Sequence, residues 1–495
     1  MGFEIERDDF DDSDYARFSD RLARCISALE HVVKRPGFGV GPATVGAELE
    51  LHLVGESGHP APVNRAVLAA ALDERVTLEM NRYNVELNTP AFPLAGRPFA
   101  TMRSELASAH AIARAAARAQ GADVVMIGIL PTLTADDLRS SALTDGCRYR
   151  ALSAGIRRGR GEPATVRIEG ADVLDVTTDD VTFEGANTSF QVHLRVDPAD
   201  FARTYNAAQI ATSFVLAVSG NSPIFLGRRL WEETRVALFR QAVEDRCEAR
   251  EDDWRPSRVS FGHGWARAGA TELFAESVGL HPPLLPQCSD EDDPEAVARA
   301  GGVPPLRELR LHHGTVWRWN RAIYDHTSGG HLRIEMRALP SGPTIDDMVA
   351  NAALAIGLTV ALSADADALV TRMTFGQARR SFYDAARFGL GAEILWPSER
   401  APSPRPWSVF ELASRLLPLA RGGLVSSGVA ADEADAWLGV VAERVGRGVT
   451  GALWQRRLYE ALSTQMPREA AASAMLDRYR ELSDGGAPVS SWPAR

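Results

Sequence analysis

The sequence is poor in cysteine and almost free of lysine. Its four cysteines, at positions 25, 147, 247 and 288, are widely spaced and form no Cys-x-x-Cys pair. This spacing gives no support for the common zinc and dithiol motifs, so we expect ordinary thiols. Of the 54 lysine and arginine residues, only Lys34 is a lysine. Such a bias is typical of coding composition, although arginine does suit phosphate and carboxylate ligands.

The chain also lacks the sequence features of an exported or membrane-inserted protein. Its first ten residues are acidic and have neither the basic nor the apolar region of a signal peptide. The longest apolar run, residues 348–364, contains Asn351 and ends before Asp365, which predicts a buried helix instead of a membrane span. We therefore expect a soluble, cytoplasmic protein with no membrane partner.

Two further absences narrow the possible ligands. A net charge of −11 disfavours nonspecific binding to nucleic acids and anionic membranes, because both repel an acidic surface. No Walker loop or dinucleotide glycine motif stands between a predicted strand and helix, so the common loop-type nucleotide sites are unsupported. A nucleotide would need another framework, such as a metal site on a sheet.

The composition itself is that of a large globular protein. The chain has 495 residues, of which 45% are hydrophobic and 24% charged, and it contains no internal repeat. We predict one large domain at residues 1–395. A proline- and serine-rich linker at 397–406 then leads to helices near 408–417, 430–445, 450–462 and 468–482. These helices would form a C-terminal helical region at residues 396–495.

Residues 44–54 are the most informative stretch, because acidic and apolar residues alternate there with a period of two. This pattern predicts a strand with Glu48, Glu50 and His52 on one face and leucines on the other. Two carboxylates separated by roughly 6 to 7 Å repel each other unless solvent, a cation or basic groups intervene. A divalent metal would remove that conflict, whereas a solvated sheet face is the simpler alternative.

The alternation recurs in three more predicted strands, which favours a shared site. They are residues 83–89 with Asn84, Glu86 and Asn88; residues 189–196 with Gln191, His193 and Arg195; and residues 331–338 with His331, Arg333, Glu335 and Arg337. In the last strand Glu335 lies between two arginines on one face, and a structural ladder of ion pairs is the alternative interpretation. Arg321 lies in the segment just before that strand.

Two charged runs stand outside these strands. Arg157, Arg158 and Arg160 lie in a segment interrupted by glycine, which we interpret as a solvated turn, with a phosphate cover as the alternative. The acidic run at 290–293 is framed by proline and glycine, which predicts a mobile surface loop or a lid.

Several short motifs, taken in their order, resemble a known family. They are Gly46-Ala-Glu-Leu-Glu50, Val85-Glu-Leu-Asn-Thr-Pro90, Gly128-Ile-Leu-Pro131, Arg148-Tyr149, Val192-His193, Asn221-Ser-Pro223 with Gly227 and Arg235, and Arg333-Ile-Glu-Met-Arg337. The set resembles the glutamate-cysteine ligase and carboxylate-amine ligase family, whose catalytic domains are similar to glutamine synthetase. The resemblance implies an α+β fold, with an antiparallel sheet that lines the active-site cleft and is flanked by helices.

The resemblance also implies roles for individual residues, with ATP and Mg²⁺ as cofactors. The implied magnesium ligands are Glu48, Glu50, Glu86, His193 and Glu335. Nucleotide contacts would come from His193, Arg321 and Arg333, while Arg235 and Arg337 would face phosphate or a substrate carboxylate. The first motif carries Ala47 and Leu49 at positions that vary among relatives. No dedicated cysteine pocket can be identified, so the amine substrate stays open.

The implied activity is ATP-dependent carbon-nitrogen ligation. Phosphoryl transfer to a carboxylate, implied to be the γ-carboxylate of glutamate, would give an acyl phosphate that an amine such as cysteine attacks. Magnesium suits this chemistry because it takes oxygen ligands and shares its shell with substrate phosphates. A nucleotide-binding or regulatory protein without turnover and a two-metal hydrolase are the alternatives. ATP-dependent formation of an amide product would separate all three.

Overall fold

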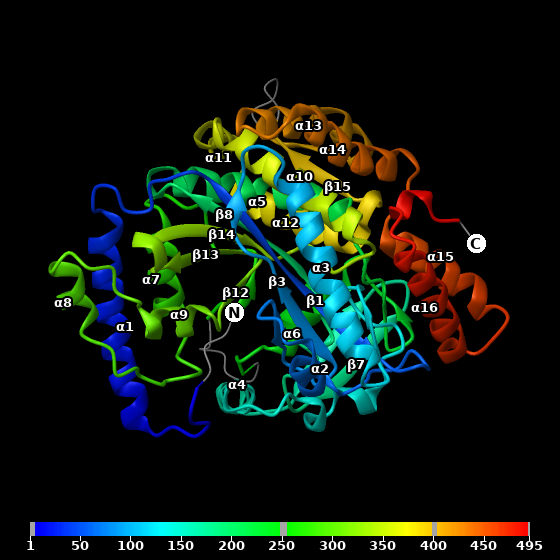
Figure 1. Ribbon diagram of the computed structural model, residues 1–495, viewed down its shortest axis with the longest axis horizontal. Coiled ribbons are helices and arrows are strands. Elements are labelled where there is room, and N and C mark those ends of the chain that lie inside the picture. The colour runs from blue at the N-terminus through cyan, green and yellow to red at the C-terminus, as the bar shows by residue number, and fades with distance from the viewer. Residues whose placement is uncertain (1–4, 248–254, 398–402, 494–495) are drawn as a thin grey trace.

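The computed structural model describes residues 5–247, 255–397 and 403–493 (Figure 1). The helices are α1 (Asp12–Val33), α2 (Asn64–Ala71), α3 (Pro98–Arg118), α4 (Cys147–Arg160), α5 (Phe201–Ala217), α6 (Thr234–Ala242), α7 (Ala270–Leu280), α8 (Pro294–Arg299), α9 (Arg307–His313), α10 (Ile345–Ser363), α11 (Ala366–Arg372), α12 (Phe375–Phe388), α13 (Val409–Ser426), α14 (Ala431–Gly446), α15 (Gly451–Ser463) and α16 (Arg468–Asp484). The main strands are β1 (Thr44–Val54), β2 (Val76–Leu78), β3 (Asn84–Asn88), β4 (Phe92–Pro93), β5 (Asp123–Val125), β8 (Phe190–Val196), β13 (Asn320–Asp325) and β14 (His331–Met336).

Smaller two-stranded sheets complete the strand set. They are β6 (Ala164–Glu169) with β7 (Val173–Thr178), β9 (Ile224–Phe225) with β10 (Arg228–Arg229), β11 (Val259–Ser260) with β12 (Trp317–Arg318), and β15 (Glu393–Trp396) with β16 (Arg405–Ser408). The β6–β7 hairpin packs on α6.

The centre of the fold is one antiparallel sheet in the order β13-β14-β8-β1-β3-β2, with β4 and β5 also paired to β1. All four strands predicted from alternation belong to this sheet. Their alternation fixes which side chains face the core, because successive residues of a strand point to opposite faces. The prediction of an α+β fold with an antiparallel sheet is confirmed.

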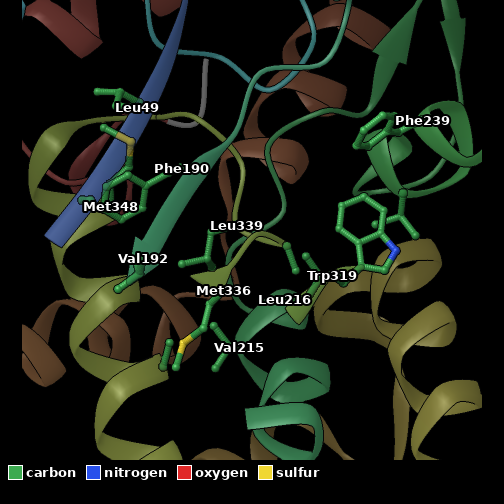
Figure 2. Close-up of a cluster of buried hydrophobic side chains, with 14 of the residues drawn as sticks. Leu49, Phe190, Val192, Val215, Leu216, Phe239, Trp319, Met336, Leu339 and Met348 are labelled. Carbon is green, nitrogen blue, oxygen red and sulfur yellow. The ribbon is translucent and has the colours of Figure 1, made fainter. Parts of the chain in front are cut away.

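The apolar face of the sheet forms the core with helices α5 and α10. Figure 2 shows Leu49, Phe190 and Met348 together at one part of this core, and Met336 beside Val215 at another. All five side chains are buried. A fully buried side chain of this size contributes roughly 1.5 to 3 kcal/mol, so burial on one face fixes the opposite, polar face in place.

Helix α10 is long and apolar enough to cross a membrane by length and composition alone, but here its apolar window is mostly buried within the protein. It packs against α5, α13 and α14. The Thr344 side chain accepts a hydrogen bond from the backbone N–H of Asp347 and so caps the first turn. The prediction of a buried helix over residues 348–364 is confirmed.

The C-terminal helices are tied to the rest of the chain by buried polar contacts. The Arg444 guanidinium of α14 lies 2.8 Å from Oδ1 of Asp347 in α10 and also donates to Asn351 and to the carbonyl of Val218. Tyr479 of α16 donates to the carbonyl of Met126. The predicted linker at 397–406 lies partly outside the described residues, and the division at residue 395 stays a prediction.

Two local predictions are wrong. Residues 157–160 are not a turn but the last turn of α4, which ends at Gly161 in the left-handed region (φ 78°); one side chain of this run, Arg160, is buried. The apolar run at residues 124–130 predicts a strand, but the strand is limited to β5, and the rest of that run is buried chain outside a strand. In both places tertiary packing overrides the local pattern.

We expect the Arg444–Asp347 ion pair to be essential for stability. In Arg444→Met the buried Asp347 carboxylate loses its cation, which should lower the free energy of unfolding by about 3 kcal/mol. Urea denaturation followed by circular dichroism measures this change. The matched control is Arg421→Met, because Arg421 pairs with Asp435 on the exposed surface, where an ion pair contributes little. Equal shifts for the two variants would contradict the role of the buried pair.

Candidate active site

The polar face of the central sheet carries two groups of candidate metal ligands. The first cluster consists of Glu48, His193 and Glu335, and the second of Glu50, Glu79 and Glu86. Within each cluster, one potential ligand atom per residue lies within 4.8 Å of the others. The five ligands implied by the family resemblance therefore all lie in these clusters, divided between them.

Strand register assembles the first cluster. His193 and Glu335 stand directly opposite each other across β8 and β14, and Glu48 comes from the adjacent β1. Nε2 of His193 lies 3.1 Å from Oε1 of Glu48 and 3.7 Å from Oε1 of Glu335. Among the described residues, Nδ1 of His193 is buried without a hydrogen-bond partner, and the ionic contact between Nε2 of His193 and Oε1 of Glu48 does not have the geometry of a hydrogen bond. Two carboxylates and an imidazole with unused buried atoms fit a divalent metal.

Two arginines hold the Glu335 carboxylate of the first cluster. Arg321 binds it through two contacts, Nε to Oε2 at 2.6 Å and Nη2 to Oε1 at 3.0 Å. Nη1 of Arg337 lies 3.3 Å from Oε2 and also donates to Gln191. Burial alone would raise the pKa of Glu335, but the two guanidinium groups outweigh it and hold this pKa well below its usual value. Glu335 is therefore a fixed anion.

The second cluster is more purely acidic. Glu50 and Glu86 stand opposite each other across β1 and β3, and Glu79 follows the end of β2. The Glu50 carboxylate accepts hydrogen bonds from the backbone N–H of Ser189 (2.6 Å) and from the Gln191 side chain (2.9 Å). All the ligand atoms are oxygens, which is the donor set that Mg²⁺ prefers.

Burial and mutual repulsion raise the pKa values of carboxyl groups in and beside the second cluster. Burial, followed by the charge of Glu86, raises the pKa of Glu50 to about 7. Burial and the charges of Glu86 and Glu50 raise the pKa of Glu79 well above its usual value. The pKa of the neighbouring Glu184 rises to about 8, through burial and then the charge of Glu50. Glu50 and Glu184 therefore titrate near neutral pH, and a divalent cation bound at the second cluster would favour the loss of their protons.

The clusters open into two neighbouring cavities. The larger, of about 450 Å³, is lined by Glu48 and the second cluster, together with Arg148, Tyr149, Glu184, Arg321, Trp317 and Arg337. The smaller, of about 150 Å³, is lined by Arg310, Arg321, Tyr324, Arg333 and Glu335. Arg321 and Gly314 line both cavities. The first cluster thus lies where the two cavities meet.

Two arginines with predicted ligand contacts, and one histidine of the acidic strand, lie apart from the clusters. Arg333 lines the smaller cavity and pairs with Asp325 at 3.2 Å. Arg235, on α6, forms a buried ion pair with Glu233 at 3.1 Å, and its charge lowers the pKa of Glu50. Among the described residues, neither Glu233 nor Arg235 lines either cavity. His52 is buried beside Asn84 and joins neither cluster.

The motifs around Arg235 meet in space although they lie far apart in the chain. A Cβ atom at Gly128 would come within 3.1 Å of Cδ of Arg235 and Cβ of Ser222. Ser222 in turn donates to Glu233. Glycine at position 128 therefore permits the close approach of α6 to the chain behind the second cluster.

Sequence reasoning missed Glu79 and Glu184. A signal for Glu79 was present, because Val76 and Leu78 alternate with Thr77 and Glu79. Thr77 pairs with Glu86 across β2 and β3, which puts the Thr77 and Glu79 positions on the acidic face. Glu184 lies in a turn outside any strand, and no periodic pattern could have indicated it.

The family of the chain follows from a comparison with family models. The model of glutamate-cysteine ligase family 2 (GCS2) matches residues 44–476, and this range is most of the chain. The chain belongs to this family. As a GCS2 protein it is an ATP-dependent carbon-nitrogen ligase that joins a carboxylate to an amine. No curated protein matches the chain.

A solved structure with a TM-score above 0.5 shows similarity of fold. The glutamate-cysteine ligase of Francisella tularensis in complex with AMP has a TM-score of 0.56 and 11% identity, over 92% of this chain and 91% of that chain. A bifunctional glutathione synthetase from Pasteurella multocida has a TM-score of 0.42 and 10% identity, over 95% of this chain and 55% of that chain. The ligase PafA in complex with the ubiquitin-like protein Pup has a TM-score of 0.41 and 9% identity, over 88% and 72% respectively.

We expect Mg²⁺ binding to release protons near pH 7. Glu50, with a pKa of about 7, must lose its proton when a cation binds, and the charge of the cation favours proton loss from the neighbouring Glu184, with a pKa of about 8. Affinity for Mg²⁺ should therefore rise between pH 6 and 8. Because these carboxyl groups bind more protons in the folded than in the unfolded chain, the metal-free protein should lose stability as pH rises through the same window.

Titration calorimetry in two buffers of different ionisation enthalpy measures the released protons. Glu79→Gln should weaken Mg²⁺ binding at least tenfold and reduce proton release. Glu74→Gln is the matched control, because Glu74 lines the same cavity outside both clusters. A binding heat independent of buffer would contradict the expected exchange of protons for metal.

Proposed function

We propose that this GCS2 protein activates the γ-carboxylate of glutamate with ATP and joins it to an amine such as cysteine. The observation that carries the proposal is the pair of ligand clusters on one sheet face, set where a larger and a smaller cavity meet. One cavity would take the nucleotide, and the other would take the two substrates that become joined.

Each cluster would hold one Mg²⁺. Glu48, His193 and Glu335 offer one site, and Glu50, Glu79 and Glu86 offer the other. When bound, the metals supply positive charge to the phosphate oxygens during phosphoryl transfer. The protein contributes fixed ligand positions, because three neighbouring strands carry the first cluster and a hydrogen-bonded pair of strands carries two residues of the second.

We assign the smaller cavity to the nucleotide. Arg321 and Arg333 line it, and His193 lies at its border with the larger cavity through its contact with Glu335. Arginine binds phosphate oxygens through a planar fork of donors, so these side chains suit a polyphosphate. The similar Francisella tularensis ligase was solved with AMP, which supports a nucleotide role for the corresponding fold.

The reaction would then proceed in two steps. A carboxylate oxygen of the donor attacks the γ-phosphorus of ATP, the bond to the ADP oxygen breaks, and an acyl phosphate forms. The amine then attacks the acyl carbon and releases a proton to solvent, while inorganic phosphate leaves with the electron pair of the broken carbon–oxygen bond. Arg337 lines the larger cavity beside Glu335 and would stabilise the charge of the phosphoryl group in transit. Arg235 would act behind the cavity by stabilising the Glu50 carboxylate.

An isotope experiment tests the proposed reaction directly. Glutamate labelled with ¹⁸O in its γ-carboxylate is incubated with ATP, Mg²⁺ and cysteine, and the products are analysed by mass spectrometry. One labelled oxygen should appear in inorganic phosphate, because phosphate leaves the acyl phosphate together with one oxygen of the donor carboxylate. Amide product with unlabelled phosphate would reject the acyl phosphate. ATP hydrolysis without any amide product would favour the two-metal hydrolase, and binding without turnover would favour a regulatory protein.

We expect Arg337→Ala to reduce turnover by roughly 10³-fold, because it removes a charge directed at the transferring phosphate. Steady-state kinetics should show the loss in kcat, with the KM for ATP changed much less. Arg195→Ala is the control, since Arg195 lies on the same sheet but bonds to the carbonyls of Gly39 and Val40. Normal turnover in folded Arg337→Ala would remove this residue from the mechanism.

A further inference from the structure

A further large cavity lies outside the candidate active site. It has a volume of about 960 Å³ and shares no lining residue with the two cavities at the metal clusters. The β6–β7 hairpin, α6 and the C-terminal ends of α4 and α12 surround it. The proposed ligation places its nucleotide and its substrates in the other two cavities.

The charge of this cavity is opposite to that of the protein. Its lining includes five arginines and three glutamates, whereas the whole chain has a net charge of −11. The arginines are Arg160, Arg167, Arg240, Arg246 and Arg387. Two of these have acidic partners at the cavity itself, Arg167 with Glu169 at 3.0 Å and Arg246 with Glu244 at 2.5 Å.

The other three arginines lack such a partner. Within the described residues, no carboxylate oxygen lies within 4.0 Å of the guanidinium groups of Arg160, Arg240 or Arg387. Arg240 and Arg387 are exposed, so water hydrates their charges. The three cations form the part of the cavity that an anionic ligand would complete.

Arg160 is the most informative of the three, because it is only 4% exposed. Its guanidinium donates to the backbone carbonyls of Glu162 and Glu244, at 2.5 and 3.4 Å. Burial lowers the pKa of Arg160, which reflects the cost of keeping a cation away from water. Buried charges are normally paired, so a cavity wall with a buried arginine and no carboxylate partner is suited to an anion.

Aromatic rings stand beside the unpaired arginines. The guanidinium of Arg387 lies 5.9 Å from the centre of the Trp231 ring, and that of Arg240 lies 5.9 Å from the Tyr383 ring. The Trp231 indole N–H donates to the carbonyl of Glu169 at 3.0 Å, which fixes the ring against β6. Both rings line the cavity and offer flat apolar surface next to positive charge.

We propose that this cavity binds a small organic anion with a planar ring and two or more phosphate or carboxylate groups. The arginine forks recognise the anionic groups, while Trp231 and Tyr383 contact the ring. The volume lies in the range of small-molecule sites. Helix α4 connects the two regions, because Arg148 and Tyr149 of α4 line the active-site cavity and Arg160 lines this one.

Titration calorimetry with two probes in EDTA tests the site and separates the two sources of anion. ADP presents phosphates and benzene-1,2,4-tricarboxylate presents carboxylates, and EDTA removes the metal that the active site would need. At least one probe should bind at one site per chain. The double variant Arg240→Gln/Arg387→Gln should weaken that binding at least tenfold and keep normal ligase activity. The variant Arg160→Gln tests in the same way whether the buried arginine contributes to binding of the probe.

The controls separate this cavity from other arginines. Arg415→Gln should leave binding unchanged, because Arg415 is an exposed arginine over Trp407 on another part of the molecule. Arg321→Ala, in the active-site cavities, should also leave it unchanged. The proposal is overturned if neither probe binds, if the double variant binds as tightly as the unchanged protein, or if Arg321→Ala abolishes binding. Each result is independent of whether the protein ligates glutamate.

Discussion

Repulsion among buried carboxylates is the constraint on which the active-site region depends. The sheet can place Glu48, Glu50, Glu86 and Glu335 close together only because opposite charge or protons compensate for their burial. Arg321 and Arg337 supply that compensation to Glu335, so its anion persists without a metal. The second cluster has less cationic support, and its carboxyl groups hold protons instead. One sheet face thus contains a permanently charged half and a half that responds to cations.

The packing on the other face of the sheet makes this arrangement possible. Leu49 and Phe190 are buried against α10, so β1 and β8 cannot rotate to expose their acidic residues to water. The C-terminal helices support α10 in turn through Arg444 and Asp347. Stability contributed by apolar burial therefore offsets the electrostatic cost on the polar face, and the helical region contributes indirectly to the geometry of the ligands.

The sequence was sufficient to predict the sheet and most of the residues in the two candidate ligand clusters. Strict alternation in four segments indicated the strands, since a period of two is typical of strands and does not match the period of a helix. It could not separate Glu48 from Glu50 into different clusters, because strand order and register are long-range properties. Glu79 was missed because β2 has only three residues, too few for a convincing period. Arg160 was misread because its guanidinium contacts the carbonyl of Glu244, which is distant in sequence.

The position of Glu48 and Glu50 on one strand has a consequence for evolution. Their spacing is set by the covalent backbone of β1, which has partners on both sides. A one-residue insertion or deletion between them would turn one carboxylate toward the core and reverse every side chain beyond it. Substitutions along β1 can be accommodated one at a time, but changes of length cannot. The divergence of such a ligase toward new substrates must therefore arise in the loops and helices around the cavities, while the length of this strand stays constant.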